Sequence, residues 1–171
     1  MSEKTTGTET AATSWKRIKN ADRYCFACGT DNPHGLHMTF ESDGAHVRSQ
    51  LELEKRYCGW SNLAHGGILA TILDETMSWT TLSLTGKLML TKGMQVKYLR
   101  PIRVGTKITV TGYIKKWLSE KKVDVVAEIR DETGKICARS SGEFPLFTRE
   151  QFLRMGIMEE AEIDAMLAII S

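Results

Sequence analysis

The sequence lacks the features that would place this protein in a membrane or outside the cell. No apolar run approaches the length of a transmembrane helix, and residues 1–20 are polar and threonine-rich, unlike a signal peptide. The chain contains only four cysteines and no export signal, which argues against a disulfide framework. We therefore expect a cytoplasmic protein with reduced thiols.

A large excess of one charge is also missing. The 23 basic and 21 acidic side chains leave a formal net charge of +2, so we expect neither nucleic acid nor a membrane surface as a partner. A locally basic site for a small anionic ligand is compatible with this balance. What the chain does have is apolar content: 42% of its 171 residues are hydrophobic, enough to form one core.

Composition divides the chain into three parts. We expect a disordered polar tail over residues 1–20, a globular domain over residues 21–148 and a helical extension over residues 149–171. A short helix over residues 15–24 is compatible with the sequence at the tail's end. In the extension, Thr148 and Glu159 are the candidate helix starts.

Alternation of apolar and polar residues predicts an antiparallel sheet of about five to six strands. An Asp-Gly pair at residues 43–44 predicts a hairpin, and apolar residues at steps of three and four predict one long helix over residues 62–84. The fold class is therefore α+β, a single antiparallel sheet wrapped on a central helix, with long edges that favour pairing with another copy. The last four strands have the spacing of a meander. The predicted strands are residues 36–42, 46–53, 92–101, 107–117, 121–131 and 135–147.

Two adjacent glycines, Gly66 and Gly67, occur in the first part of the predicted helix, within "LAHGGILATILDE". Each costs about 0.5 to 1 kcal/mol relative to alanine in a helix interior. A helix N-terminus presents unpaired N–H groups and partial positive charge, and glycine lets a substrate oxygen approach them. The pair predicts a donor site for a carbonyl oxygen, although a cap or a tight packing contact gives the same pattern.

Asp74 lies in the same helix, nine residues beyond His65. Nine residues advance a helix by about 13.5 Å and two and a half turns, so one small substrate cannot touch both ends of this stretch in one chain. If Gly66 and Asp74 serve one reaction centre, two chains must supply them, and the sequence then predicts a homodimer with two composite sites. An ordinary solvated carboxylate is the alternative.

The same stretch carries a family resemblance. Together with "TKGMQVKYLRPI", "HGGILATILDE" resembles the PaaI-like acyl-CoA thioesterases of the hotdog-fold superfamily. The upstream "CFACGTDNPHGLHMTF" is similar to a segment found in relatives of the mammalian thioesterase superfamily members. The resemblance covers residues from about 25 to 147. It implies a hotdog fold, a homodimer or dimer of dimers, and an acyl-CoA substrate, with no cofactor beyond the coenzyme A of that substrate.

The resemblance also implies roles for individual residues. Gly66 would supply the backbone N–H that polarises the thioester carbonyl, with His65 helping to place it. Asp74 of the opposite subunit would be the base that activates water or the nucleophile that attacks the carbonyl. Thr91 matches the Ser or Thr that positions the water or the carboxylate. Glu75 stays open as the working carboxylate.

Further binding residues follow from the same motif. Gly67 and Asn62 flank the donor site, and Arg100 is the best candidate for the phosphates of coenzyme A. Some relatives carry a polar residue where this chain has Gly59. Asn62 either replaces that polar group or caps the helix.

The cysteines of "YCFACGTDNPHGLH" form a second motif. Cys25, Cys28, His34 and His37 lie within a span that can hold zinc. The histidines follow very closely, however, and His37 falls in a predicted strand. We therefore favour a turn in which the cysteines are small buried residues, and we expect no metal.

The predicted function is hydrolysis of an acyl-CoA to the free acid and coenzyme A. Trp60, Met77 and Trp79 are candidates for the acyl pocket, but for each of them we favour core packing. A hotdog hydratase or dehydratase and a non-catalytic acyl-CoA sensor are the two rival functions.

Overall fold

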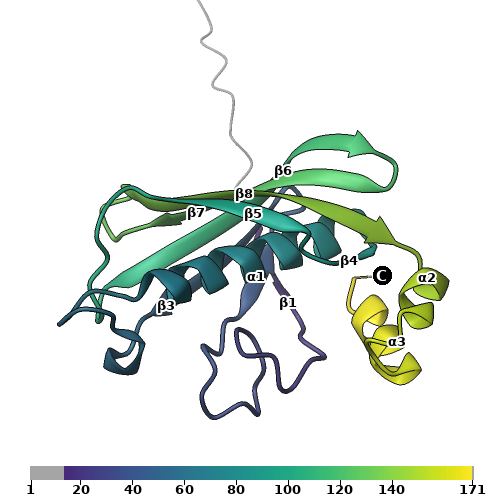
Figure 1. Cartoon of the computed structure of the whole chain (residues 1–171), viewed down its shortest axis with the longest axis horizontal. Coiled ribbons are helices and arrows are strands. Elements are labelled where there is room, and N and C mark those ends of the chain that lie inside the picture. The colour runs from purple at the N-terminus through teal and green to yellow at the C-terminus, as the bar shows by residue number, and fades with distance from the viewer. Residues whose placement is uncertain (1–13, 171) are drawn as a thin grey trace, which may run out of the picture.

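The computed structural model describes residues 14–170, in which one antiparallel sheet wraps one long helix (Figure 1). The helix is α1, Gly66–Thr85, and two short helices, α2 (Arg149–Arg154) and α3 (Glu160–Ala168), follow the sheet. The predicted fold class is confirmed, with eight strands among these residues rather than five to six. The strands are β1 (Lys16–Ile18), β2 (Phe40–Ser42), β3 (His46–Glu52), β4 (Leu88–Met89), β5 (Gly93–Tyr98), β6 (Lys107–Ser119), β7 (Lys122–Arg130) and β8 (Ile136–Phe147).

The order of the strands corrects the predicted meander. The sheet runs β1-β2-β3-β6-β7-β8, and both β4 and β5 pair with β8. Strand β5 therefore lies beside β8 and not beside β6, whose other neighbour is β3. Within the described chain β5 pairs with β8 alone. One edge of β5 is left without a partner strand, which matters for the site below.

Helix α1 packs on the concave face of the sheet through a continuous apolar surface. Leu69, Ile72, Leu73 and Met77 are almost fully buried there. The contact with β6 is close, because a Cβ at Gly112 would lie 2.2 Å from the Thr80 hydroxyl oxygen. Only glycine fits at that position while α1 keeps this distance from the sheet. None of the described helices is long and apolar enough to cross a membrane.

Three buried threonines on α1 satisfy their own hydroxyl groups. Thr76, Thr80 and Thr81 each donate a hydrogen bond to the backbone carbonyl four residues earlier, at 2.8, 2.6 and 2.8 Å. These bonds let polar residues be buried against the sheet without unpaired groups.

Two expectations near the N-terminus are wrong. Residues 15–24 form no helix, and β1 pairs with β2 within the range expected to be a disordered tail. The rest of that expectation, residues 1–13, falls outside the described residues. The long helix begins at Gly66 and not at residue 62, because the backbone N–H groups of Ala64 and His65 donate to Ile102 and Tyr57.

The expected starts of the terminal helices are confirmed. Thr148 and Glu159 are the N-caps of α2 and α3, and each forms a capping box with the residue three positions later.

Candidate active site

At the N-terminus of α1, the backbone N–H groups of Gly66 and Gly67 have different hydrogen-bond partners. His65 is the N-cap, and its Nδ1 accepts a hydrogen bond from the Gly67 N–H at 2.9 Å. The Gly66 N–H has no partner among residues 14–170. Gly66 therefore presents a free backbone donor at the positive end of the helix, whereas the N–H of Gly67 is already used.

Tyr98, which the sequence analysis missed, lies against this helix end. Its hydroxyl donates to the Gly66 carbonyl at 2.7 Å, although 54% of the residue is exposed. Gly66, Leu69, Tyr98 and Arg100 line a hollow of about 310 Å³. Arg100, the predicted phosphate-binding residue, thus borders the same hollow as the free donor, and its guanidinium donates to the Ile136 carbonyl. The sequence signal that could have identified Tyr98 is its position in "KYLRP", two residues before Arg100 and so on the same face of an extended chain.

Asp74 lies two turns further along α1, beside Thr91. The Thr91 hydroxyl donates to Asp74 Oδ1 at 2.9 Å. Burial raises the pKa of Asp74 above its ordinary value, and the Thr91 hydrogen bond opposes part of that rise. The structure thus brings together the predicted carboxylate and the threonine expected to position it.

Glu75 points in another direction. Its Oε1 accepts a hydrogen bond from Trp79 Nε1 at 2.9 Å and lies 3.6 Å from the Cys25 Sγ. Burial, followed by the nearby Cys25, raises the pKa of Glu75 to about 7. The carboxylate of Glu75 is therefore held by Trp79 of its own helix and by Cys25 of the segment before β2.

One chain alone does not join the two halves of the predicted site. Gly66 and Asp74 are eight residues apart on α1, or about 12 Å along its axis. Strand β5 and the two residues ahead of it run alongside α1, with Thr91 at Asp74 and Tyr98 at Gly66. The two half-sites therefore lie at opposite ends of one edge strand.

Asn62 and the three candidates for the acyl pocket lie in different surroundings. Asn62 is not the N-cap; its side-chain oxygen accepts from Arg103 at 3.2 Å instead. Met77 and Trp79 belong to the buried core, whereas Trp60 is 86% exposed. The expectation of core packing is therefore wrong for Trp60.

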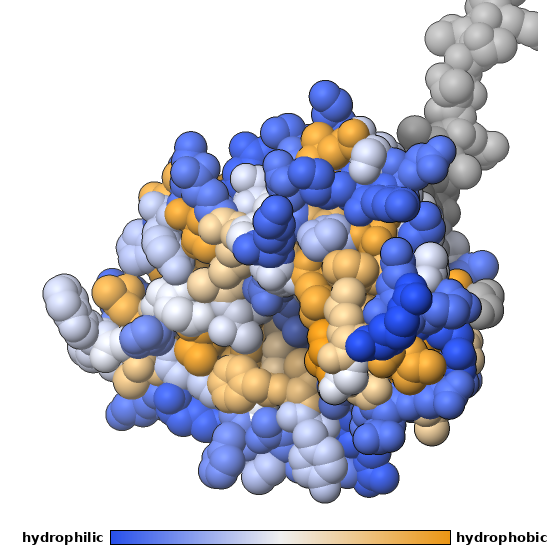
Figure 2. Space-filling model, turned by 45° about the vertical axis from the view of Figure 1, so that its right-hand side comes forward, coloured by the Kyte–Doolittle hydropathy of each residue, from blue (hydrophilic) through white to orange (hydrophobic). Residues whose placement is uncertain are grey.

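A second hollow, of about 250 Å³, adjoins the Asp74 end of the site. Figure 2, turned to bring the side of α2 and α3 forward, shows apolar side chains around a hollow in the surface. Trp79 lines this second hollow from α1, and Thr91 lines it from the segment just ahead of β5. The full lining set is Asp22, Cys25, Cys28, Glu75, Ser78, Trp79, Leu82, Met89, Leu90, Thr91 and Met166.

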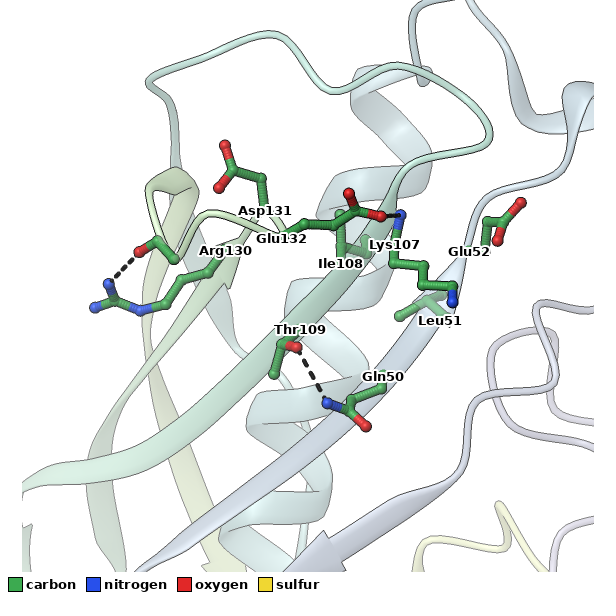
Figure 3. A pocket seen from close by; sticks show the side chains of 10 residues that line it. Gln50, Leu51, Glu52, Lys107, Ile108, Thr109, Arg130, Asp131 and Glu132 are labelled. Atoms are coloured by element: carbon green, nitrogen blue, oxygen red, sulfur yellow. Dashed lines mark hydrogen bonds between the residues drawn. The ribbon is translucent and has the colours of Figure 1, made fainter.

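A third hollow, of about 660 Å³, is larger than the two at the predicted site and lies elsewhere (Figure 3). It is lined by the end of β3, the start of β6 and the turn between β7 and β8. Its polar groups pair with one another: Gln50 donates to Thr109 at 3.4 Å, and the Lys107 backbone N–H donates to Glu132 at 3.3 Å. None of the predicted site residues lines it, so its size does not make it the active site.

Comparisons with known proteins agree with this fold. Residues 61–138 match the family model of the thioesterase superfamily. A solved thioesterase superfamily protein is 26% identical with a TM-score of 0.65, over 80% of this chain and 70% of that one. The Escherichia coli PaaI protein from the phenylacetic acid degradation operon is 16% identical with a TM-score of 0.60, over 66% of this chain and 81% of PaaI.

Two further relatives are informative, one because it was solved with coenzyme A and one because of its length. A hypothetical thioesterase protein from Streptococcus pneumoniae, solved with coenzyme A, is 18% identical with a TM-score of 0.57, over 61% of this chain and 80% of that one. Verlamelin biosynthesis protein B from a Lecanicillium species is 28% identical over 125 residues, or 57% of this chain. The chain spans about half the length of this curated relative, 54%.

These findings identify the class of protein. Residues 61–138 match the thioesterase superfamily, and the architecture of the described chain is the hotdog fold that the sequence resemblance implied.

Proposed function

We propose that this protein hydrolyses an acyl-CoA thioester to the free acid and coenzyme A. The superfamily match and the coenzyme A bound to the pneumococcal neighbour support a substrate of this class. The observation that carries the proposal is the pairing of Asp74 with Thr91 at one end of β5 and the free Gly66 donor at the other.

Gly66 acts on the thioester carbonyl. Its N–H points out of the helix N-terminus, where no described group competes for it. A carbonyl oxygen placed there gains a hydrogen bond and the favourable helix dipole as negative charge develops on it. The His65 ring fixes the first turn by accepting from Gly67, so the donor keeps its direction.

Asp74 acts as the base that takes a proton from water, or as the nucleophile itself. Thr91 holds one carboxylate oxygen and leaves the other available to the reactants. A half-buried carboxylate with a raised pKa is a stronger base than a solvated one.

A homodimer joins the two halves. If the free edge of β5 pairs antiparallel with the same strand of a second copy, the Thr91 end of one strand comes beside the Tyr98 end of the other. Asp74 then lies near Gly66 of the partner subunit, and the dimer holds two composite sites. The same pairing covers an edge that would otherwise invite aggregation.

Arg100 completes the proposal for coenzyme A. Arg100 is exposed and borders the Gly66 hollow. If the thioester carbonyl binds the Gly66 N–H, the nucleotide of coenzyme A can lie along this hollow. An arginine suits phosphate because its planar group can donate two parallel hydrogen bonds.

The test is release of free thiol from a panel of acyl-CoAs by the wild type and by Asp74→Asn. The substitution keeps the shape of the side chain and removes the base, so we expect turnover to fall by about 100-fold or more. Asp124→Asn on β7 is the matched control, because this aspartate pairs with Lys115 away from α1. Unchanged turnover in Asp74→Asn would remove Asp74 from the mechanism, and no turnover of any acyl-CoA by the wild type would favour a sensor.

A further inference from the structure

Three metal-ligating side chains from two separate elements meet beside the active site. Cys25 and Cys28 come from the connector, defined here as residues 19–39 between β1 and β2, and Glu75 comes from α1. Their sulfur and carboxylate atoms all lie within 4.8 Å of one another. Figure 1 shows the connector on the side of α1 away from the sheet, where Glu75 meets it.

The spacing of these atoms fits a tetrahedral ion. With Zn–S of about 2.3 Å and Zn–O of about 2.0 Å, a tetrahedral site requires about 3.5 Å between a sulfur and an oxygen ligand. The Cys25 Sγ lies 3.6 Å from Glu75 Oε1. Two thiolates and one carboxylate are also a donor set that zinc accepts.

The local backbone directs both cysteines to one side. The Gly29 N–H donates to the Cys25 carbonyl at 2.8 Å, and the Cys28 N–H points at the Cys25 Sγ at 3.4 Å. The turn is too tight for any other residue at 29, since a Cβ there would lie 2.6 Å from the Arg23 and Cys25 carbonyl oxygens. The Cys28 N–H aimed at the Cys25 sulfur favours the charged, metal-binding form of that thiol.

Trp79 positions the third ligand. Its indole N–H donates to the Glu75 oxygen that faces Cys25, at 2.9 Å. Such a hydrogen bond to a ligand oxygen holds a metal-binding carboxylate in place. His37, considered as a ligand from sequence, lies instead with its Nδ1 3.0 Å from the Gly29 carbonyl oxygen, and His34 is exposed.

We propose that Cys25, Cys28 and Glu75 bind a zinc ion, with water from the adjoining hollow as the fourth ligand. All three residues line the 250 Å³ hollow, which provides the open coordination position. Binding displaces the two thiol protons and fastens the connector to α1 one residue from Asp74. The inference does not depend on thioester hydrolysis, and it replaces our expectation that these cysteines only pack.

The test measures metal binding directly on the full chain. Protein purified with a reductant and without chelator is expected to contain one zinc ion per chain by elemental analysis. Stripped protein refilled with Co²⁺ is expected to show a thiolate-to-cobalt charge-transfer band. Both signals should be lost in Cys25→Ser and in Glu75→Gln and kept in Cys58→Ser, a cysteine outside the cluster.

A second variant separates ligation from folding. Trp79→Phe removes the hydrogen bond to Glu75 but keeps an aromatic side chain, and we expect zinc affinity to fall about 10- to 100-fold in competition with a chromophoric chelator. Stripped wild type that takes up neither zinc nor Co²⁺ under reductant would overturn the proposal. So would equal metal content in the wild type and Cys25→Ser.

Discussion

Asp74 and Glu75 are neighbours in the sequence but face different parts of the molecule. Asp74 contacts Thr91, two residues ahead of the edge strand β5, whereas Glu75 contacts Cys25 of the connector. One step along a helix turns the side chain by about 100°. Two adjacent carboxylates can therefore serve two tasks, one in the reaction and one in holding the connector.

The strongest test of these two separate roles is to remove each carboxylate in turn. We expect Asp74→Asn to lower kcat by about 100-fold or more, since the base is lost. Glu75→Gln is expected to cost at most about tenfold in kcat, because its effect reaches the site only through the position of the connector. Steady-state kinetics on one acyl-CoA measure both. A loss in Glu75→Gln as large as that in Asp74→Asn would contradict the division of roles.

The proposed site also divides its roles between the two ends of α1, Gly66 at one and Asp74 at the other. Mixing two inactive variants, one altered at each end, tests this division. Gly66→Pro removes the N–H donor at a helix position where proline is tolerated, so the variant should fold but lose most activity. Mixed with Asp74→Asn chains and allowed to exchange, half of the dimers should carry one intact composite site, giving about a quarter of wild-type activity. Size-exclusion chromatography checks the dimers. A mixture no more active than either parent would argue against a shared site.

A variant of Thr91 tests the role of Asp74 without altering Glu75. Thr91→Val keeps the shape and removes the hydrogen bond to Asp74, worth about 1.5 to 3 kcal/mol when one partner is charged. We expect kcat to fall by about 10- to 100-fold. Thr91→Ser should restore most of it, and zinc content should stay at the wild-type level. Equal kcat in the valine variant and the wild type would show that the hydrogen bond does not support catalysis.

Local signals in the sequence predicted the parts of the molecule that depend on neighbouring residues. The apolar period predicted α1, the Asp-Gly pair predicted the β2–β3 hairpin, and Thr148 and Glu159 marked the terminal helices. The family resemblance then pointed to Asp74 and Thr91, which the fold places in contact.

The features that sequence reasoning missed depend on contacts between distant residues. Cys25 and Glu75 are fifty positions apart, and no local pattern joins them. Tyr98 reaches Gly66 only because β5 lies along α1. Strand β1 has three residues, too few for an alternation pattern to register, and it exists because β2 pairs with it.

The rotation of α1 that separates the two carboxylates is itself fixed by packing against the sheet. Gly112→Ala would place a Cβ 2.2 Å from the Thr80 hydroxyl, and overpacking of this kind costs about 1 to 3 kcal/mol. We expect the free energy of unfolding in urea to fall by that amount. Thr80→Ala added to Gly112→Ala removes the obstructing hydroxyl, so the double variant should lose less than the sum of the two single losses. Strictly additive losses would mean that this contact does not set the distance between α1 and β6.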